Sequence, residues 1–169
     1  MPNFSDLIQY FENIARNHVD IRHSDSEKHF FRMEIEEVIG GINRTDVKFP
    51  LLILEAYSFS LSDSRSDNLL KNRSGAFILL DHISDPSDFD QIHEKWDNLE
   101  QIGTEIAIRL KHDKQSRLIP VIRDFNFDSL DATLIMNEVG SDIGIRFTYN
   151  IISPVTNDIN PDKWIEPYG

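Results

Sequence analysis

Strict alternation of apolar and polar side chains near the end of the chain constrains the fold most. Every second residue from Ile143 to Ile151 is apolar, and the residues between them are small or polar. Successive side chains of a strand point to opposite faces, so this stretch has one face for a core and one for water. That division is typical of an antiparallel sheet. Residues 130–137 alternate in the same way, and Gly140 and Ser141 can form a two-residue hairpin turn between the two stretches.

Two further strands are predicted upstream, over residues 49–61 and 75–83. Both are rich in leucine, isoleucine and phenylalanine. Pro50 can stand at the start of the first strand, where no ladder donor is needed. The hydrophilic segment 62–73 between them is predicted to be a long loop joining the two strands of a hairpin. Loops of that length inside a compact domain are uncommon and tend to be functional or mobile.

Two helices are predicted. Ser5 can cap a helix over about residues 6–18. Asp85 as N-cap and Pro86 at the first helical position begin a longer helix that runs to about residue 111. Gly103 in its middle is expected to let another element approach closely. The second helix has apolar residues at intervals of three and four, and they are Phe89, Ile92, Trp96, Leu99, Ile102, Ile106 and Leu110.

These elements predict an α+β fold, with an antiparallel sheet of about four to five strands and both helices packed on one of its faces. The long helix is expected to meet the sheet through Phe89, Trp96, Leu99 and Ile106. Residues 30–42 suit either a helix or a strand, and we expect a short strand followed by a helical turn. An extended piece broken by Pro120 is expected over 117–127. We expect one domain over residues 1–154 and an irregular tail over 155–169.

Composition limits the classes of function. The chain has 169 residues, no cysteine and a formal net charge of −12. Without cysteine there are no disulfides, thiolate nucleophiles or cysteine-rich zinc sites. So acidic a chain is not expected to bind nucleic acid specifically, because duplex affinity comes largely from neutralised phosphates. The N-terminus does not resemble a signal peptide and no apolar run is long enough to span a membrane, so the cytoplasm is the expected location until assembly into a particle.

No motif predicts catalysis or a cofactor. The glycine-rich phosphate loops and the nucleophile-elbow pattern are both missing from the sequence. His82, Asp85 and His93 could share a metal ion only if the turn between strand and helix brought them together. The abundant carboxylates cannot be distinguished from surface charge. We therefore expect no enzyme activity, no cofactor and no metal site.

The predicted loop 62–73 is the candidate contact with a neighbouring subunit. An apolar pair stands there among residues of both charges, which could set the register between identical subunits. The alternative is that the apolar pair simply starts the next strand. The candidate contact residues are Asp63, Arg65, Asp67, Leu69, Leu70 and Lys71. The aromatic residues Trp164 and Tyr168 in the tail are expected to dock on their own domain or on a partner.

The order of elements resembles that of the tail-terminator, or tail-completion, proteins of tailed phages and related contractile devices. The resemblance covers the amphipathic first helix, the FPLLILE and GAFILLDHI strands with the hydrophilic segment between them, the DPSDF helix start and the closing hairpin. It implies a structural subunit that forms rings, commonly hexameric, which end a tail tube and join it to the head. The implied partners are other copies of the chain and other tail or head–tail proteins, and the family has no catalytic residues.

Two other classes compete with this hypothesis. An acidic binding or immunity-type module would block a basic partner and would be a monomer with a concentrated acidic face. A hydrolase with an unrecognised site would have a deep pocket holding carboxylates with shifted pKa values.

Overall fold

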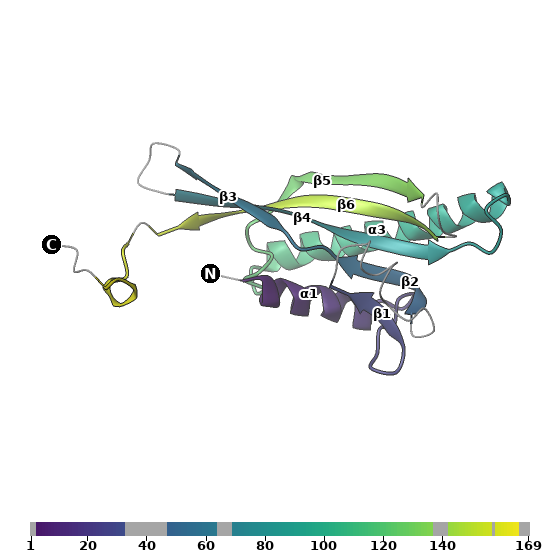
Figure 1. Ribbon diagram of the computed structural model, residues 1–169, viewed down its shortest axis with the longest axis horizontal. Helices are drawn as coiled ribbons and strands as arrows, with labels where there is room; N and C mark the ends of the chain where they lie inside the picture. Colours follow the sequence, from purple (N-terminus) through teal and green to yellow (C-terminus); the bar gives the residue numbers. More distant parts are fainter. Residues whose placement is uncertain (1–2, 33–46, 64–68, 137–141, 157, 166–169) are drawn as a thin grey trace.

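A mixed sheet covered by two helices on one face forms the body of the protein (Figure 1). The computed structural model describes residues 3–32, 47–63, 69–136, 142–156 and 158–165. α3 packs against β6, β4 and β5, and α1 packs against β1 and β2. The predicted α+β class, with both helices on one face, is therefore confirmed. The helices and strands are α1 (Phe4–Asn17), β1 (Lys28–Phe31), β2 (Val47–Leu54), β3 (Ser58–Asp63), β4 (Leu69–His82), α3 (Phe89–Ser116), β5 (Phe125–Met136) and β6 (Asp142–Val155).

The sheet has six strands in the order β1-β2-β4-β6-β5, with β3 also paired to β4. It therefore has slightly more strands than expected, and one pair, β1 with β2, is parallel. All other pairs are antiparallel. β4 and β6 pair without interruption from Leu69 opposite Val155 to His82 opposite Asp142. The uninterrupted β4–β6 ladder is the central spine of the molecule.

The predicted strand over 49–61 is in fact two strands with a register shift between them. Leu54 lies opposite Phe77, whereas Ser58 lies opposite Ser74. From Leu54 to Ser58 the chain advances by four residues, whereas the paired segment of β4, from Phe77 to Ser74, advances by three. One extra residue is therefore accommodated between Leu54 and Ser58. An extra residue of this kind moves the side chains that follow it to the other face, because strand side chains alternate.

Both helices begin at residues other than those predicted. Asn3, not Ser5, is the N-cap of α1: its side chain accepts from the Asp6 N–H, and the Asp6 carboxylate accepts from the Asn3 N–H. This reciprocal pair is a capping box, which satisfies two N–H groups at once. Asp88, not Asp85, caps α3 by accepting from Gln91 N–H. Asp85 instead binds the N–H and hydroxyl of Ser87 in the preceding turn.

The main core lies between the helices and the sheet. All five alternating residues from Ile143 to Ile151 are buried, as predicted, four of them in this core and Ile143 in a smaller cluster with Ile83 and Ile92. Leu99 and Ile106 of α3 join them, but Phe89 is 68% exposed and does not pack on the sheet. Trp96 is partly buried against the main core. A Cβ at Gly103 would collide with the ring of Phe147, which confirms the expected close approach.

The chain between α3 and β5 is compact, so the extended piece predicted over 117–127 is wrong for residues 117–124 and is present only from Phe125, where β5 begins. Hydrogen-bonded turns at Ile119 and Pro120 lead directly into Phe125, the first residue of β5. After Val155, the described part of the tail contains one turn of 3-10 helix at Pro161–Lys163. Two sequence-based expectations, the helical turn after β1 and the turn at Gly140 and Ser141, lie outside the described residues.

Candidate functional site

Three strands continue past the ends of the helices and form what we call the arm. It comprises Ser58–Asp63, Leu69–Ser74 and Asn150–Val155, with β4 in the middle. Figure 1 shows the arm projecting beyond the N-terminal end of α1. Every residue of β3 is exposed, and no other described strand pairs with its outer edge. The backbone groups along such an edge can pair with another chain.

The two faces of the arm differ in chemistry. Phe59 and Leu61 lie on one face, 58% and 54% exposed, although both are large and apolar. On the same face the Nζ atom of Lys71 lies 4.1 Å from the centre of the Phe59 ring, a cation–π contact. The opposite face of β3 carries only serine, at positions 58, 60 and 62. One face of the arm therefore carries Phe59, Leu61 and Lys71, and the other carries the serines of β3 together with Ile152, which is 39% exposed.

Most of the sequence-predicted contact residues belong to strands of the arm, so the long loop predicted over 62–73 is wrong. Asp63 ends β3 opposite Leu69, and Lys71 lies opposite Leu61. Leu69 and Leu70 start β4, which was the alternative interpretation of this pair. They are neighbours along a strand, so they point to opposite faces and do not form one apolar patch. Arg65 and Asp67 lie outside the described residues.

Phe59 and Leu61 are the contact candidates that sequence reasoning missed. They were assigned to a buried strand continuous with Leu51–Leu54. The usable signal is the pattern Ser-Phe-Ser-Leu-Ser over residues 58–62. A strand with small polar residues on one face and isolated apolar residues on the other is typical of a sheet edge that is only partly covered.

A chain of contacts between α1 and β6 fixes the root of the arm. The ring of Phe4 meets that of Tyr57 edge-on, with centroids 5.2 Å apart. The guanidinium of Arg73 lies over Tyr57, 5.8 Å from the ring centroid, and its Nη1 donates to Ser153 Oγ at 3.2 Å. Arg73 is only 4% exposed. These contacts hold the arm at a fixed angle to the first helix.

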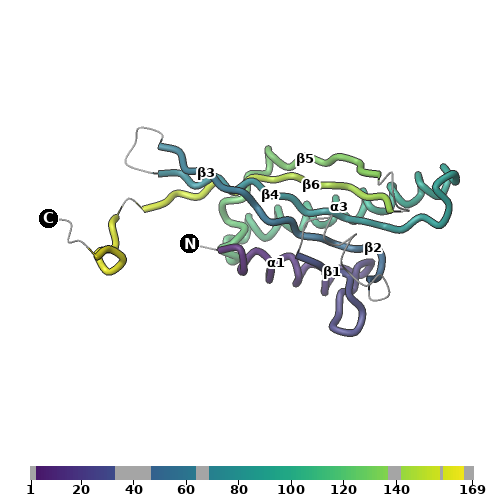
Figure 2. Tube along the Cα trace, in the orientation of Figure 1, coloured from purple at the N-terminus to yellow at the C-terminus, as the bar shows by residue number. Residues whose placement is uncertain are grey.

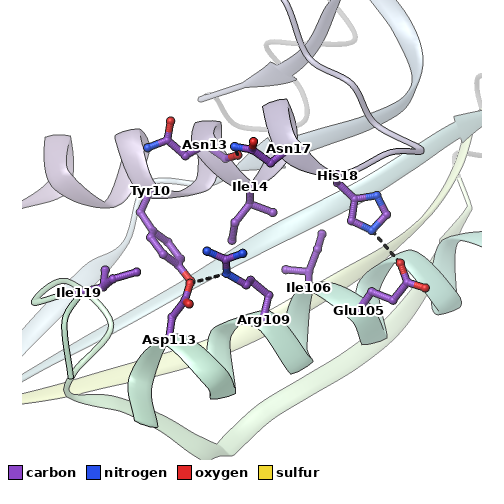
Figure 3. A pocket seen from close by; sticks show the side chains of 10 residues that line it. All are labelled: Tyr10, Asn13, Ile14, Asn17, His18, Glu105, Ile106, Arg109, Asp113 and Ile119. Atoms are coloured by element: carbon purple, nitrogen blue, oxygen red, sulfur yellow. Dashed lines mark hydrogen bonds and ion pairs between the residues drawn. The ribbon is translucent and has the colours of Figure 1, made fainter. Parts of the chain in front are cut away.

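A groove of about 440 Å³ between α1 and α3 is the second candidate site (Figure 3). Its polar centre is Asp113, whose Oδ2 accepts from the Tyr10 hydroxyl at 2.8 Å and from Arg109 Nε at 2.7 Å. Burial of Asp113 disfavours its charge, but hydrogen bonds from Arg109, Tyr10 and His112 outweigh it and lower the pKa of the carboxyl. Burial, followed by the bond to Asp113, raises the pKa of Tyr10. The network joins the two helices.

His18 makes a second bridge across the same groove. Its Nε2 lies 3.0 Å from Glu105 Oε2, and its Nδ1 accepts from the backbone N–H of Asp20 at 3.3 Å. His18, Asp20 and Glu105 are close enough together to be considered as metal ligands. The Asp20 N–H occupies Nδ1, and the buried Nε2 approaches Glu105 without forming a hydrogen bond, so we assign the group a structural role as a contact between the two helices.

The metal trio considered from sequence is not brought together. His82 Nδ1 lies 2.9 Å from Asp142 Oδ1, and Asp85 is engaged by Ser87. The ring of His93 stacks beside Trp96 with centroids 6.5 Å apart. Within the described part of the chain, these residues do not form a group that could share one ion.

Comparison with known families and proteins gives no further assignment. No protein-family model matches the chain, and no curated protein matches it. In the described part of the chain, neither helix combines the length and apolar character needed to cross a membrane.

Proposed function

We propose that this protein is a structural subunit that assembles with copies of itself through the arm, in the tail of a phage or of a phage-derived device. The observation that carries the proposal is that β3 exposes Phe59 and Leu61 on one face, with Lys71 of β4 beside them, while no other described strand pairs with its outer edge. When a strand of one chain is added to a sheet of another, backbone groups at the sheet edge form the hydrogen bonds and exposed apolar side chains supply further contacts. A rigid arm that reaches past its own body supplies this surface without disturbing the core.

The tail-terminator ring is the assembly we favour, and it rests on the resemblance in the order of elements. A ring needs a contact between two different surfaces of the same subunit, repeated by rotation until it closes. A projecting arm that grips the body of the next copy has this character. The strongly acidic composition suits a lumen through which DNA passes without adhering.

A hydrolase has less support from the groove between α1 and α3. A catalytic general acid needs a raised pKa, whereas three hydrogen-bond donors lower that of Asp113. Its oxygens are already engaged by Tyr10, Arg109 and His112. These hydrogen bonds join α1 to α3, and this structural role explains the arrangement.

The double variant Phe59→Ser and Leu61→Ser tests the proposal. It removes the apolar groups of the arm but leaves the buried core in place, so the circular dichroism spectrum should not change. The mass measured by light scattering should fall from that of an oligomer to that of a monomer of 19.6 kDa.

The matched control is Ser58→Thr with Ser60→Thr, on the opposite face of the same strand. Threonine suits strands, so this variant should assemble like the parent. A double-serine variant that still forms the parental oligomer would exclude the arm face as the contact. A parent that stays monomeric at high concentration, even with its genomic neighbours added, would exclude the ring and favour the acidic binding module.

A further inference from the structure

The C-terminal end of α3 is a cationic surface on an otherwise acidic protein. Between Ile106 and Asp124 the basic residues are Arg109, Lys111, Lys114, Arg117 and Arg123, and the two acids are Asp113, which is bonded to Arg109, and Asp124, which is bonded to Arg123. A surface hollow of about 480 Å³ lies there, lined by Lys114, Gln115, Arg117 and Arg123. Beside it Leu118 is 83% exposed. We call these hollow-lining residues and Leu118 the cationic end.

The backbone at Arg117 indicates that the cation there has a use beyond ending the helix. Arg117 has φ 57° and is the C-cap of α3 in the left-handed conformation. Glycine is the usual residue at such a position because a side chain is strained there. Strained backbone of this kind is concentrated at binding sites. The arginine places an exposed positive charge at the mouth of the hollow.

The described tail, residues 158–165, has the complementary chemistry. The acids Asp158 and Asp162 and the base Lys163 are all exposed, so the segment has one more acid than base. Between and beyond them Ile159, Trp164 and Ile165 are 51%, 57% and 103% exposed. Asn160 caps the short 3-10 turn by accepting from the Asp162 N–H at 3.0 Å, which gives the segment a defined shape.

We propose that residues 158–165 of one copy dock on the cationic end of a second copy, with Asp158 and Asp162 facing Arg117, and an apolar tail residue on Leu118. The pairing of β6 with β4 through Val155 sends the tail of each chain away from its own body. Figure 2 shows the tail leaving the far end of β6. A neighbouring copy is therefore the natural acceptor. This inference rests on the proposed self-assembly and adds a second contact to it.

A peptide titration tests the docking separately from the arm. A synthetic peptide of residues 158–165 is titrated into the Phe59→Ser and Leu61→Ser variant, which the proposed function expects to be a monomer. Saturable binding that weakens as salt rises is expected, because the contact is charged and exposed. Arg117→Glu should weaken it about tenfold or more. Arg22→Glu is the matched control, because Arg22 also has positive φ (54°) but lies outside the cationic end, and it should leave binding unchanged.

Disulfide trapping tests whether the tail reaches a second copy, since the chain has no cysteine of its own. Chains carrying Arg117→Cys are mixed with chains carrying Asp162→Cys and oxidised. A cross-linked dimer is expected, whereas Thr104→Cys, on an exposed part of α3 remote from the cationic end, should give none. A chain carrying both Arg117→Cys and Asp162→Cys should form linked multimers.

The outcomes separate the two proposals. Absence of peptide binding together with absence of cross-linking would overturn the tail docking and leave the arm untouched. A doubly substituted chain that closes on itself as a monomer would overturn the role of a second copy. If the 158–165 peptide binds but the Phe59→Ser and Leu61→Ser variant still assembles like the parent, the arm proposal alone is refuted.

Discussion

Individual residues carry two kinds of information here, one about stability and one about binding. Arg117 and Asp113 lie four residues apart near the end of α3, yet one charge is exposed and the other is buried in a hydrogen-bond network. Asp113 is 3% exposed and bonded on both oxygens, so its charge is used inside the molecule. Arg117 is exposed and stands in a strained conformation, so its charge faces outward.

Replacing Arg117 by glycine should stabilise the fold. The left-handed conformation costs an arginine about 1 kcal/mol that glycine does not incur. The free energy of unfolding, measured in urea, should therefore rise by up to about 1 kcal/mol, while binding of the 158–165 peptide falls. Arg117→Ala keeps the backbone strain and is the control that should show no gain. A glycine variant that is less stable than the parent would mean that the arginine side chain supports the fold.

Asp113→Asn should destabilise the protein by about 1–3 kcal/mol at neutral pH, because a buried network loses its charged acceptor. The folded-state pKa of Asp113 lies below its unfolded value of about 3.9. Its contribution is therefore complete above about pH 4 and is lost as the pH falls through the folded-state value. The difference between parent and variant in urea unfolding should shrink in acid.

The control for that measurement is Asp97→Asn, on the exposed side of α3. It should change the free energy of unfolding by less than about 0.5 kcal/mol. A parent–variant difference for Asp113 that stays constant from neutral pH into acid would show that the carboxylate is not the stabilising species.

Among the secondary-structure elements, features marked by a local sequence pattern were predicted correctly more often than the pairing of distant strands. The alternation around Phe147 and Tyr149 gave the buried face of β6 correctly, because the signal is contained in one strand. The parallel pairing of β1 with β2 depends on contacts between distant segments and has no local signature. Each of the two missed helix starts has two possible capping residues close together. The reciprocal bond of Asn3 with Asp6 identifies the cap of α1, and the bond from Gln91 to Asp88 identifies the cap of α3.

The segment 62–73, in which the sequence predicts a subunit contact, was predicted to be a loop, but its described residues belong to β3 and β4. Polar composition around Asn72 indicated a loop, since exposed loops and exposed strands share that composition. The extra residue between β2 and β3 could not be predicted either, because the sequence pattern does not mark it. Apolar residues continue through it, so nothing in the pattern marks the register shift that turns Phe59 and Leu61 onto their face.

Deleting Ala56 tests the role of that register shift. Ala56 is exposed and lies in the short connection between β2 and β3. Removing one residue should place β3 in the register of β2 and turn Phe59 and Leu61 to the opposite face of the arm. We expect the core to stay folded by circular dichroism and assembly in light scattering to be lost. A deletion variant that assembles like the parent would show that the face presented by β3 does not matter.

At the scale of the whole molecule, charge is unevenly distributed. The formal net charge is −12, yet the end of α3 is cationic, so one copy can attract another while the assembly as a whole stays acidic. The two helices are joined to each other by the Asp113 and His18 bridges. These bridges consist of the hydrogen bonds to Asp113 and the ion pair of His18 with Glu105.

Chelation should therefore leave the melting temperature unchanged. Because His18 is bridged to Glu105 and to the Asp20 N–H, EDTA has nothing to remove from that group. Differential scanning fluorimetry with and without EDTA measures this directly. His18→Gln should lower the melting temperature equally in both conditions. A parent that melts earlier in EDTA, with a His18→Gln variant that does not respond, would assign a bound ion to the His18, Asp20 and Glu105 group.

The continuous β4–β6 ladder has a mechanical consequence. Because the same two strands run through the core and out to the tip of the arm, a load applied at the tip acts along the strands and is shared by many ladder hydrogen bonds at once. In this geometry the force shears the two strands past each other, so many hydrogen bonds must break together. A force that separated the strands from one end would instead break the bonds one at a time. A subunit held by its neighbours through the arm could transmit tension into its core without first losing the arm.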